Sequence, residues 1–437
     1  MLILSNVAKL FDGTSGQAAA VHAGVDLHLD GGRIAELRPH QPELALGAGH
    51  SLVDCAGLTV LPGLVDCHGH ITVMGLDSAS METMLGPEEY TWVERALYAT
   101  LVDGGVTTYR DIGGATDHIK RLVDDGTLIG PRLKIAICML SSTGGHADFR
   151  GPDRCHASLS RLWPEAPGRP SSLVDGPWEC RKRVREIVAC GADLIKICSS
   201  PGVASPGDAL EHREFTAEEV AAICDEAGAR GLKVAAHAHS RSGIELAIAN
   251  GVQDIQHISY MDERLVELAH ERGCSVTPTS WILQSMLHAS GLSDFVMEKV
   301  KQVSEVHAQA TAFAIAGGLP ILAGTDPVLP GMHGRNWREL QALVKEGMSV
   351  LGAFHAMTGL AARSIDQADA GTLVAGQRAD LLVCSQDVLS DPAAFEDGAL
   401  LEVIKDGVGY RGGLDGVPQR SWSGRVRETL NAANKQP

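Results

Sequence analysis

Short apolar runs alternate with helical patterns through the middle of the chain. The eight apolar runs cover residues 61–73, 105–114, 132–142, 192–200, 233–240, 254–262, 274–281 and 319–327. For one intervening helix the sequence predicts both ends. Thr216 and Glu219 form a capping-box pattern at its start, and Gly228 or Gly231 can end it. Eight strands that alternate with helices predict an α/β protein with a parallel (β/α)8 barrel of the TIM type, rather than an open sheet.

Both ends of the chain have a different sequence pattern. Short runs typical of β-strands are separated there by Asp-Gly and Gly-Gly pairs, which are typical of hairpin turns. The pattern occupies residues 2–13, 23–37, 371–385 and 401–413. The similarity of the two flanks predicts one small β-domain built from residues 1–61 and 367–437, with the barrel between them at residues 62–366.

Several of the apolar runs end in side chains that can bind metal ions. The first run ends in His68-Gly69-His70, and residues two apart on a strand point to the same side. The later runs supply Lys196, His237, His257 and Asp326 near their ends. A single histidine at such a position is more often a hydrogen-bonded core residue than a ligand. Because active sites of these barrels lie at the C-terminal ends of the strands, the six side chains together predict a metal site at that rim.

Lys196 has two interpretations, because an unpaired charge in a crowded barrel interior is costly. It can form a salt bridge to Asp326 or to another acid. Alternatively, the neutral amine takes up CO2 as a carbamate, which is a carboxylate suited to bridging two divalent metal ions. The surrounding motifs favour the carbamate.

Three further residues near these motifs are not expected to bind metal. His239 faces the same way as His237 on a strand, and we expect it to support the ligands. Cys67 points to the face opposite His68 and is expected in the core. Cys198 is expected to be a small buried thiol.

Composition limits the partners and the compartment of the protein. The chain has 437 residues, enough for one large domain or two with a sizeable core. Lys+Arg number 37 and Asp+Glu number 54, and the net charge of −17 argues against a nucleic-acid partner. The first residues lack a signal-peptide pattern, and no run reaches the roughly 18 apolar residues of a membrane span. With ten scattered cysteines, these features favour a cytoplasmic protein with reduced thiols and no membrane partner.

The motifs taken together resemble those of the amidohydrolase superfamily. The stretches LPGLVDCHGH, DLIKI, AAHAHS, IQHISYMD and LAGTDP carry the resemblance, and the presence of Lys196 resembles the binuclear subtype with a carboxylated lysine. Residues 105–114, 142–153, 256–263, 322–340 and 371–383 are similar to the branch that contains prolidase-like Xaa-amino-acid dipeptidases and ochratoxin amidohydrolases. The resemblance covers nearly the whole chain and implies a (β/α)8 barrel with a small β-sandwich formed from both termini.

The resemblance also implies roles for individual residues. One divalent ion would lie among His68, His70, Lys196 and Asp326, and a second among Lys196, His237 and His257. Zinc suits such a site, although manganese or cobalt would also fit. His146 and Tyr260 would contact the substrate near its carboxylate or scissile carbonyl.

The stretch from residue 147 to 180 is long, proline-rich and polar, and it follows the third strand. Loops of this length are usually functional or disordered, so it either covers the barrel mouth or is a surface insertion. Candidate partners for a substrate carboxylate are Arg150, Arg154 and Arg161 within the stretch, and Arg335 and Arg338 after the eighth strand.

These features predict a metal-dependent hydrolase that cleaves the amide bond of a dipeptide or an N-acyl amino acid, as a dipeptidase, a carboxypeptidase or an ochratoxin-type amidohydrolase would. Two divalent ions activate a bridging hydroxide, and Asp326 acts as general base and then protonates the leaving nitrogen. Hydrolysis of a cyclic amide or a lactone on the same scaffold is the alternative. A non-catalytic barrel scaffold is a minor alternative, since it predicts loss of ligands and all six positions are filled. We further expect a homo-oligomer.

Overall fold

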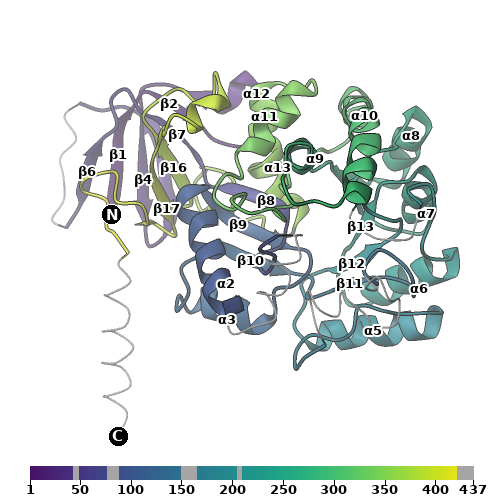
Figure 1. The fold of residues 1–437 in the computed structure, drawn as a ribbon. Coiled ribbons are helices and arrows are strands. Elements are labelled where there is room, and N and C mark those ends of the chain that lie inside the picture. Colours follow the sequence, from purple (N-terminus) through teal and green to yellow (C-terminus); the bar gives the residue numbers. More distant parts are fainter. Residues whose placement is uncertain (43–48, 76–87, 149–164, 204–208, 421–437) are drawn as a thin grey trace, which may run out of the picture.

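The computed structural model describes residues 1–42, 49–75, 88–148, 165–203 and 209–420. One part of the molecule consists of parallel strands flanked by helices, and the other of sheets made from both ends of the chain (Figure 1). Within the described ranges, no helix combines the length and the apolar character needed to cross a membrane.

The apolar runs in the middle of the chain form parallel strands. They are β8 (Leu64–Gly69), β9 (Val106–Asp111), β10 (Arg132–Ile135), β11 (Met139–Leu140), β12 (Ile195–Cys198), β13 (Val234–Ala238), β14 (Asp254–His257) and β15 (Ser275–Thr277). Their order is β10-β9-β8 in one sheet and β11-β12-β13-β14-β15 in the other, and every neighbouring pair is parallel. Each of the first seven predicted runs therefore contains a strand.

Two of the predicted runs depart from regular strand geometry. The third run is divided into β10 and β11, because Ile137 between them has a φ of 70°, which a continuous strand does not allow. The eighth run, residues 319–327, is not assigned as a strand, but it is bridged in parallel to β15 at Val276. The Cys67 amide donates to the Ala323 carbonyl at 2.9 Å, so this run is hydrogen-bonded to both β15 and β8.

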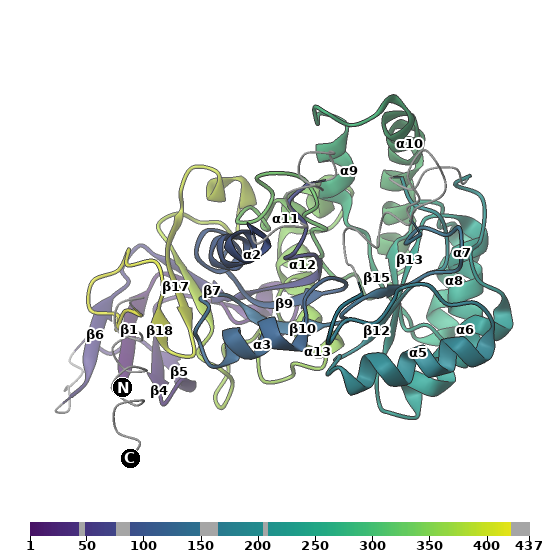
Figure 2. The same cartoon turned by 60° about the horizontal axis from the view of Figure 1, so that its bottom comes forward.

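Helices connect most of the parallel strands. The described helices are α2 (Glu88–Tyr98), α3 (Asp117–Asp124), α5 (Pro177–Ala189), α6 (Ala217–Gly228), α7 (Arg241–Ala249), α8 (Glu263–Arg272), α9 (Ser280–Met286), α10 (Asp294–Ala316), α11 (Arg338–Lys345), α12 (Val350–Ala356) and α13 (Gly359–Ser364). The predicted capping box of Thr216 and Glu219 is present, and α6 ends at Gly228. Figures 1 and 2 show α5, α6, α7 and α8 along the outer side of β12 and β13.

The two ends of the chain form two sheets that share a core. The strands are β1 (Leu2–Val7), β2 (Lys9–Phe11), β3 (Val21–His22), β4 (Val25–Asp30), β5 (Arg33–Pro39), β6 (Ser51–Asp54), β7 (Thr59–Pro62), β16 (Leu381–Cys384), β17 (Leu400–Lys405) and β18 (Val408–Gly409). One sheet has the order β5-β4-β1-β6 and the other β18-β17-β16-β7-β2-β3. Leu4, Leu27, Val60, Leu381 and Ile404 lie in one buried cluster, so the first and last described segments pack on each other.

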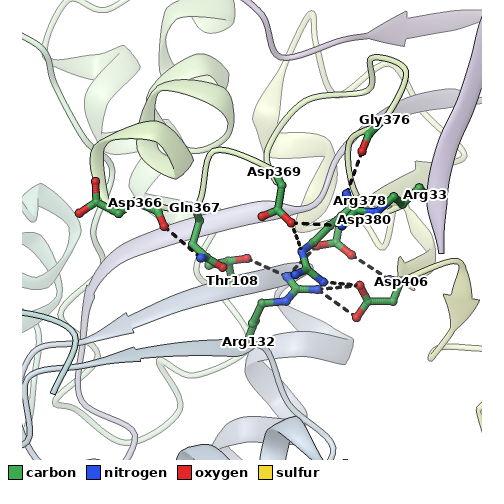
Figure 3. Close-up of polar contacts among 10 residues, drawn as sticks. All are labelled: Arg33, Thr108, Arg132, Asp366, Gln367, Asp369, Gly376, Arg378, Asp380 and Asp406. Atoms are coloured by element: carbon green, nitrogen blue, oxygen red, sulfur yellow. Dashed lines mark hydrogen bonds and ion pairs between the residues drawn. The ribbon is translucent and has the colours of Figure 1, made fainter. Parts of the chain in front are cut away.

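A cluster of ion pairs joins the parallel strands to these sheets (Figure 3). Arg132 on β10 donates to Asp380 at 2.8 Å and to both carboxylate oxygens of Asp406 at 3.0 Å. Arg378 donates to Asp406 at 3.0 Å. Asp380 is almost fully buried. Because a buried carboxylate is costly without its partner, these contacts fix the two parts against each other.

Candidate metal centre

The side chains predicted to bind metal lie on or just after four of the parallel strands and in the eighth run. His68 is on β8 and His70 follows it, Lys196 is on β12, His237 is on β13, His257 ends β14, and Asp326 lies near the end of the eighth run. The Asp326 amide donates to the His68 carbonyl at 2.8 Å. The ring centroids of His68 and His257 are 4.8 Å apart, so the side chain from β8 lies next to the side chain from β14.

His68, His70 and Asp326 form one group, in which the ligand atoms lie within 4.8 Å of one another. Oδ1 of Asp326 is 3.6 Å from Nε2 of His68 and 3.5 Å from Nε2 of His70. Nδ1 of His70 donates to the Gly113 carbonyl at 2.8 Å, which leaves the Nε2 lone pair facing Asp326. Burial lowers the pKa of His70 to about 3, so the ring is neutral and can bind a cation.

His237, His239 and His257 form a second group with ligand atoms within 4.8 Å of one another. Ring centroids are 4.5 Å apart for His237 and His257, and 4.7 Å apart for His239 and His257. Burial lowers the pKa of all three rings well below the usual histidine value. The sequence-based expectation placed His239 outside the ligand set, whereas one of its ring nitrogens lies within reach of both partners.

Lys196 is fully buried on β12. Its Nζ donates to Oε1 of Gln256 at 2.9 Å, and Nε2 of Gln256 donates to Asp254 at 2.7 Å. Among the residues that the structure describes, no carboxylate oxygen lies within 4.0 Å of this amine, so the salt bridge considered from the sequence is not formed. Burial lowers the pKa of Lys196 to about 7, so much of the amine is neutral near neutral pH.

A buried carboxylate on β8, Asp66, supports the first group. It accepts hydrogen bonds from the His68 amide at 3.1 Å, the Thr325 hydroxyl at 2.5 Å and the Asn336 side-chain amide at 2.7 Å. It thereby ties the strand that carries His68 to the segment that carries Asp326. Asp66 was not predicted as a site residue, although an acidic residue inside an apolar run was an available signal.

Two positions of the site have left-handed backbone. The φ angle is 69° at His257 and 47° at Asp326, values that residues other than glycine seldom adopt. Such strained residues cluster at functional sites. Burial raises the pKa of Asp326 to about 7, so this carboxyl can take or release a proton near neutral pH.

The two residues predicted to contact the substrate have different surroundings. The ring of His146 stacks on His237 with centroids 4.1 Å apart. Tyr260 follows β14, where its amide donates to the His239 carbonyl at 3.0 Å, and its ring packs against the cluster around Trp281. His146 thus contacts the second histidine group directly, whereas Tyr260 is joined to it through the backbone.

The structure describes two of the five arginines that were considered as partners for a substrate carboxylate. Arg150, Arg154 and Arg161 lie outside the described residues, as do residues 149–164 of the loop that was considered as a cover for the barrel mouth. Arg335 is exposed, and Arg338 donates to Glu396 at 3.2 Å. Arg335 is therefore the more available of the two described candidates.

The donor set suits divalent metal ions. Imidazole nitrogens and a carboxylate oxygen, in two groups of three, are the ligands that zinc and similar ions bind. Nδ1 of His68 is buried and has no hydrogen-bond partner among the described residues, while Nε2 faces Asp326. Burial keeps the closely packed rings neutral, and their lone pairs stay available for a cation.

Comparison with known proteins defines the class. The sequence pattern of the Amidohydrolase family matches residues 59–409. Ochratoxinase from Aspergillus niger is 32% identical over 368 residues, which cover 81% of this chain and 76% of that protein. The crystal structure of a Xaa-Pro dipeptidase with bound methionine in the active site has a TM-score of 0.84 at 28% identity, covering 94% of this chain and 100% of that one. A prolidase complexed with N-methylphosphonate-L-proline has a TM-score of 0.84 at 29% identity, covering 94% and 99%.

The α/β fold with histidine-rich groups at its strand ends is that of a hydrolase class that generally uses divalent metals, and the chain belongs to the amidohydrolase family. Its relatives include ochratoxinase and prolidase-like amidohydrolases, which confirms the branch that the motifs indicated. The protein is accordingly a hydrolase that acts on amide bonds. Enzymes of this family act on small-molecule substrates.

Proposed function

We propose that this protein is a binuclear metal-dependent amidohydrolase that cleaves the amide bond of a dipeptide or an N-acyl amino acid. The observation that carries the proposal is the presence of two adjacent ligand groups together with a fully buried lysine on β12. The substrate class is supported by the relatives, since one is named an ochratoxinase and a solved neighbour is named a Xaa-Pro dipeptidase.

We infer that the parallel strands close into a (β/α)8 barrel of residues 62–366, and that residues 1–61 and 367–437 form a small β-sandwich domain. Hydrogen bonds from residues 319–327 to both β15 and β8 support closure of the barrel. The hydrophobic cluster shared by the two chain ends supports the second domain. In such a barrel the strand ends face an open rim that a small molecule can enter.

We assign His68, His70, Lys196 and Asp326 to one divalent ion, and Lys196, His237 and His257 to the other, with zinc as the expected metal. When bound, two such ions supply a Lewis acid and a hydroxide nucleophile at neutral pH. The neutral histidine rings and the short distances between their ligand atoms support this assignment.

The role of Lys196 is that of a bridging carbamate. The neutral Nζ attacks CO2, a new N–C bond forms and one proton leaves, so that an amine becomes an anionic carboxylate. The remaining N–H can still donate to Gln256, which lies 2.9 Å from Nζ. The low pKa of this lysine, which burial brings to about 7, supports the step because only the neutral amine reacts.

Asp326 is assigned the proton transfers. It takes the proton of the attacking water and delivers it to the leaving nitrogen, which would otherwise depart as a poor leaving group. A pKa of about 7, raised by burial, supports both directions of transfer. His146 and Tyr260 are assigned to the substrate, and the stacking of His146 on His237 supports its part. We keep the expectation of a cytoplasmic homo-oligomer.

A hydrolysis screen tests the proposed function. Purified protein, reconstituted with zinc, is incubated with dipeptides, N-acyl amino acids, ochratoxin-type amides, cyclic amides and lactones, and products are identified by mass spectrometry. Cleavage of linear amides that stops after chelation and returns with zinc supports the proposal. Cleavage of cyclic substrates alone would favour the alternative activity, and linear cleavage that is indifferent to chelation would contradict metal dependence.

A further inference from the structure

A chain of buried hydrogen bonds leads from His239 in the second histidine group to the carboxylate of Glu346, at the C-terminal end of α11. Nδ1 of His239 is 2.8 Å from Oγ of Ser259, which is 3.0 Å from Nδ1 of His307 on α10. Nε2 of His307 is 3.1 Å from Oγ of Ser280, which is 2.5 Å from Oε2 of Glu346. The two histidines and two serines are each at most 3% exposed.

The carboxylate at one end fixes the direction of every bond in this chain. An ionised Glu346 can only accept, so the single hydroxyl proton of Ser280 points to it. Oγ of Ser280 then accepts from Nε2–H of His307, and burial, which lowers the pKa of His307 to about 4, keeps that ring neutral. Nδ1 of His307 is consequently a lone pair.

The same donor and acceptor rules set the direction of the remaining hydrogen bonds, from His307 to His239. The lone pair at Nδ1 of His307 accepts the hydroxyl proton of Ser259. Oγ of Ser259 in turn accepts from Nδ1–H of His239. A neutral His239 has only one ring proton, so its Nε2 is left as a lone pair. Among the described residues, none forms a hydrogen bond with this Nε2, and the ring lies beside His237 and His257.

The hydrogen-bond chain with all donors and acceptors reversed is disfavoured at one contact, that of Ser280 with Glu346. It requires Nε2–H on His239, Nδ1–H on His307 and a proton from Ser280 donated to Nε2 of His307. Ser280 would then turn its lone pairs toward the carboxylate of Glu346, and a charge-assisted hydrogen bond would be replaced by repulsion. The remote carboxylate therefore selects the tautomer at the site.

We propose that Glu346 is a positioning residue that holds His239 in the Nδ1–H tautomer, so that Nε2 of His239 binds a divalent cation beside His237 and His257. The ring contacts of the three histidines and the reach of their ligand atoms are those of one ion site. The proposal rests on the proposed metal-dependent function and adds a third imidazole to the second ion.

Histidine tautomers can be read directly in the metal-free protein. The protein is labelled with 15N-histidine, and the His239 signals are assigned by their loss in His239→Gln. Spectra are taken at about pH 8.5, where Glu346 is ionised, because burial raises its pKa to about 7. We expect Nδ1 of His239 to carry the proton. In both Ser280→Ala and Glu346→Ala the Nε2–H form should increase about fivefold or more, the effect of one ordinary hydrogen bond.

Ser285→Ala is the matched control. Ser285 lies on α9 like Ser280, but its hydroxyl donates to the Trp281 carbonyl at 2.9 Å and takes no part in the chain. Its removal should leave the His239 tautomer unchanged. A His239 that carries its proton at Nε2 in the wild-type protein, or that keeps its tautomer in both test variants, overturns the proposal.

Zinc affinity tests the ligand role separately. Competition with a chelator should show weaker binding of one of the two ions in Ser280→Ala and Glu346→Ala, by about 10–100-fold, with no change in Ser285→Ala. A shift of tautomer with unchanged zinc affinity would overturn the ligand role. If the screen finds no amide hydrolysis, the proposed function fails, while the tautomer and zinc measurements still decide this inference.

Discussion

Burial changes the protonation of Lys196 and Asp326 in opposite senses. It lowers the pKa of the lysine and raises that of the aspartate, and both come to about 7. A neutral amine and a protonatable carboxyl are therefore present together at the strand ends. At the scale of single residues, substitutions here should alter the chemistry before they alter the fold.

Replacement of Asp326 tests its assignment as proton carrier. Asp326→Asn keeps the shape and one oxygen ligand but removes the base, so kcat on amides should fall by about 10²–10⁴-fold while the protein stays folded. Steady-state kinetics on metal-loaded protein measures this. Asp397→Asn, at an exposed position, serves as the control and should be unaffected. Activity within a few-fold of wild type in metal-loaded Asp326→Asn would refute the assignment.

Replacement of Lys196 tests the carbamate bridge. Lys196→Ala should lose most of the bound metal, and activity should fall by at least about 100-fold, because a ligand shared by both ions is gone. Short carboxylic acids should restore part of both, since they can occupy the position of the carbamate. The control Lys182→Ala removes a largely exposed lysine and should behave as wild type. Full metal content in Lys196→Ala would rule out the bridge.

The residues at strand ends were predictable because their spacing and type were visible along the chain. His68 and His70 are recognisable as a pair two residues apart, and their approach to Asp326 was expected if the strand ends meet at one rim. Asp66 and Gln256 were not predicted, because their roles depend on partners far away in sequence. His239 was given a supporting role, since periodicity places a side chain on a face but does not fix its ring orientation.

At the scale of elements, Asp66 holds β8 to the irregular eighth run. Asp66→Ala would leave the Thr325 hydroxyl, the Asn336 amide and the His68 amide without their acceptor. Each buried unsatisfied group costs about 1–3 kcal/mol, so we expect unfolding free energy to drop by at least about 3 kcal/mol and metal to bind more weakly. Urea unfolding and chelator competition measure these changes.

The controls for Asp66 separate a lost acceptor from a lost charge. Asp66→Asn retains one carbonyl oxygen and should lose less stability than Asp66→Ala. Asp54→Ala removes an exposed carboxylate from β6 and should stay within about 0.5 kcal/mol of wild type. Equal stability of Asp66→Ala and wild type would mean that the eighth run is held by other contacts.

Elements were predicted well where a local signal exists. The capping box at Thr216 fixed the start of α6, and the Gly31-Gly32 pair marked the turn between β4 and β5. The division of the third run at Ile137 was not visible, because isoleucine prefers strands and nothing in its type predicts a positive φ. The eighth run kept its hydrogen bonds to both neighbours without regular strand geometry.

At the scale of the whole molecule, the ion pairs of Figure 3 hold the two parts together. Arg132→Met keeps most of the side-chain length but leaves Asp380 buried without its 2.8 Å partner. Loss of one partner of a buried pair costs about 3–5 kcal/mol, so the urea midpoint should fall accordingly. Arg121→Met, which removes an exposed arginine, should change stability by less than about 0.5 kcal/mol. Equal midpoints for the two variants would show that this interface is not fixed by the ion pairs.

The assembly of both chain ends into one region was predictable because both ends have the pattern of short strands and hairpin turns. One buried hydrophobic cluster contains residues from both ends. The contacts between that region and the parallel strands were not predictable. Arg132 and Asp380 are 248 positions apart, and nothing in their local sequence pairs them. Long-range charge pairing is settled by the packed fold and not by local pattern.

Metal stoichiometry against activity tests the central claim most directly. Metal-free protein is titrated with zinc, and bound metal and amide hydrolysis are measured on the same samples. A binuclear site with Lys196 as the bridge predicts full activity only as the content approaches about two ions per chain, with the loss of either ion abolishing hydrolysis. Full activity at one ion per chain, or in protein stripped of metal, would contradict the account.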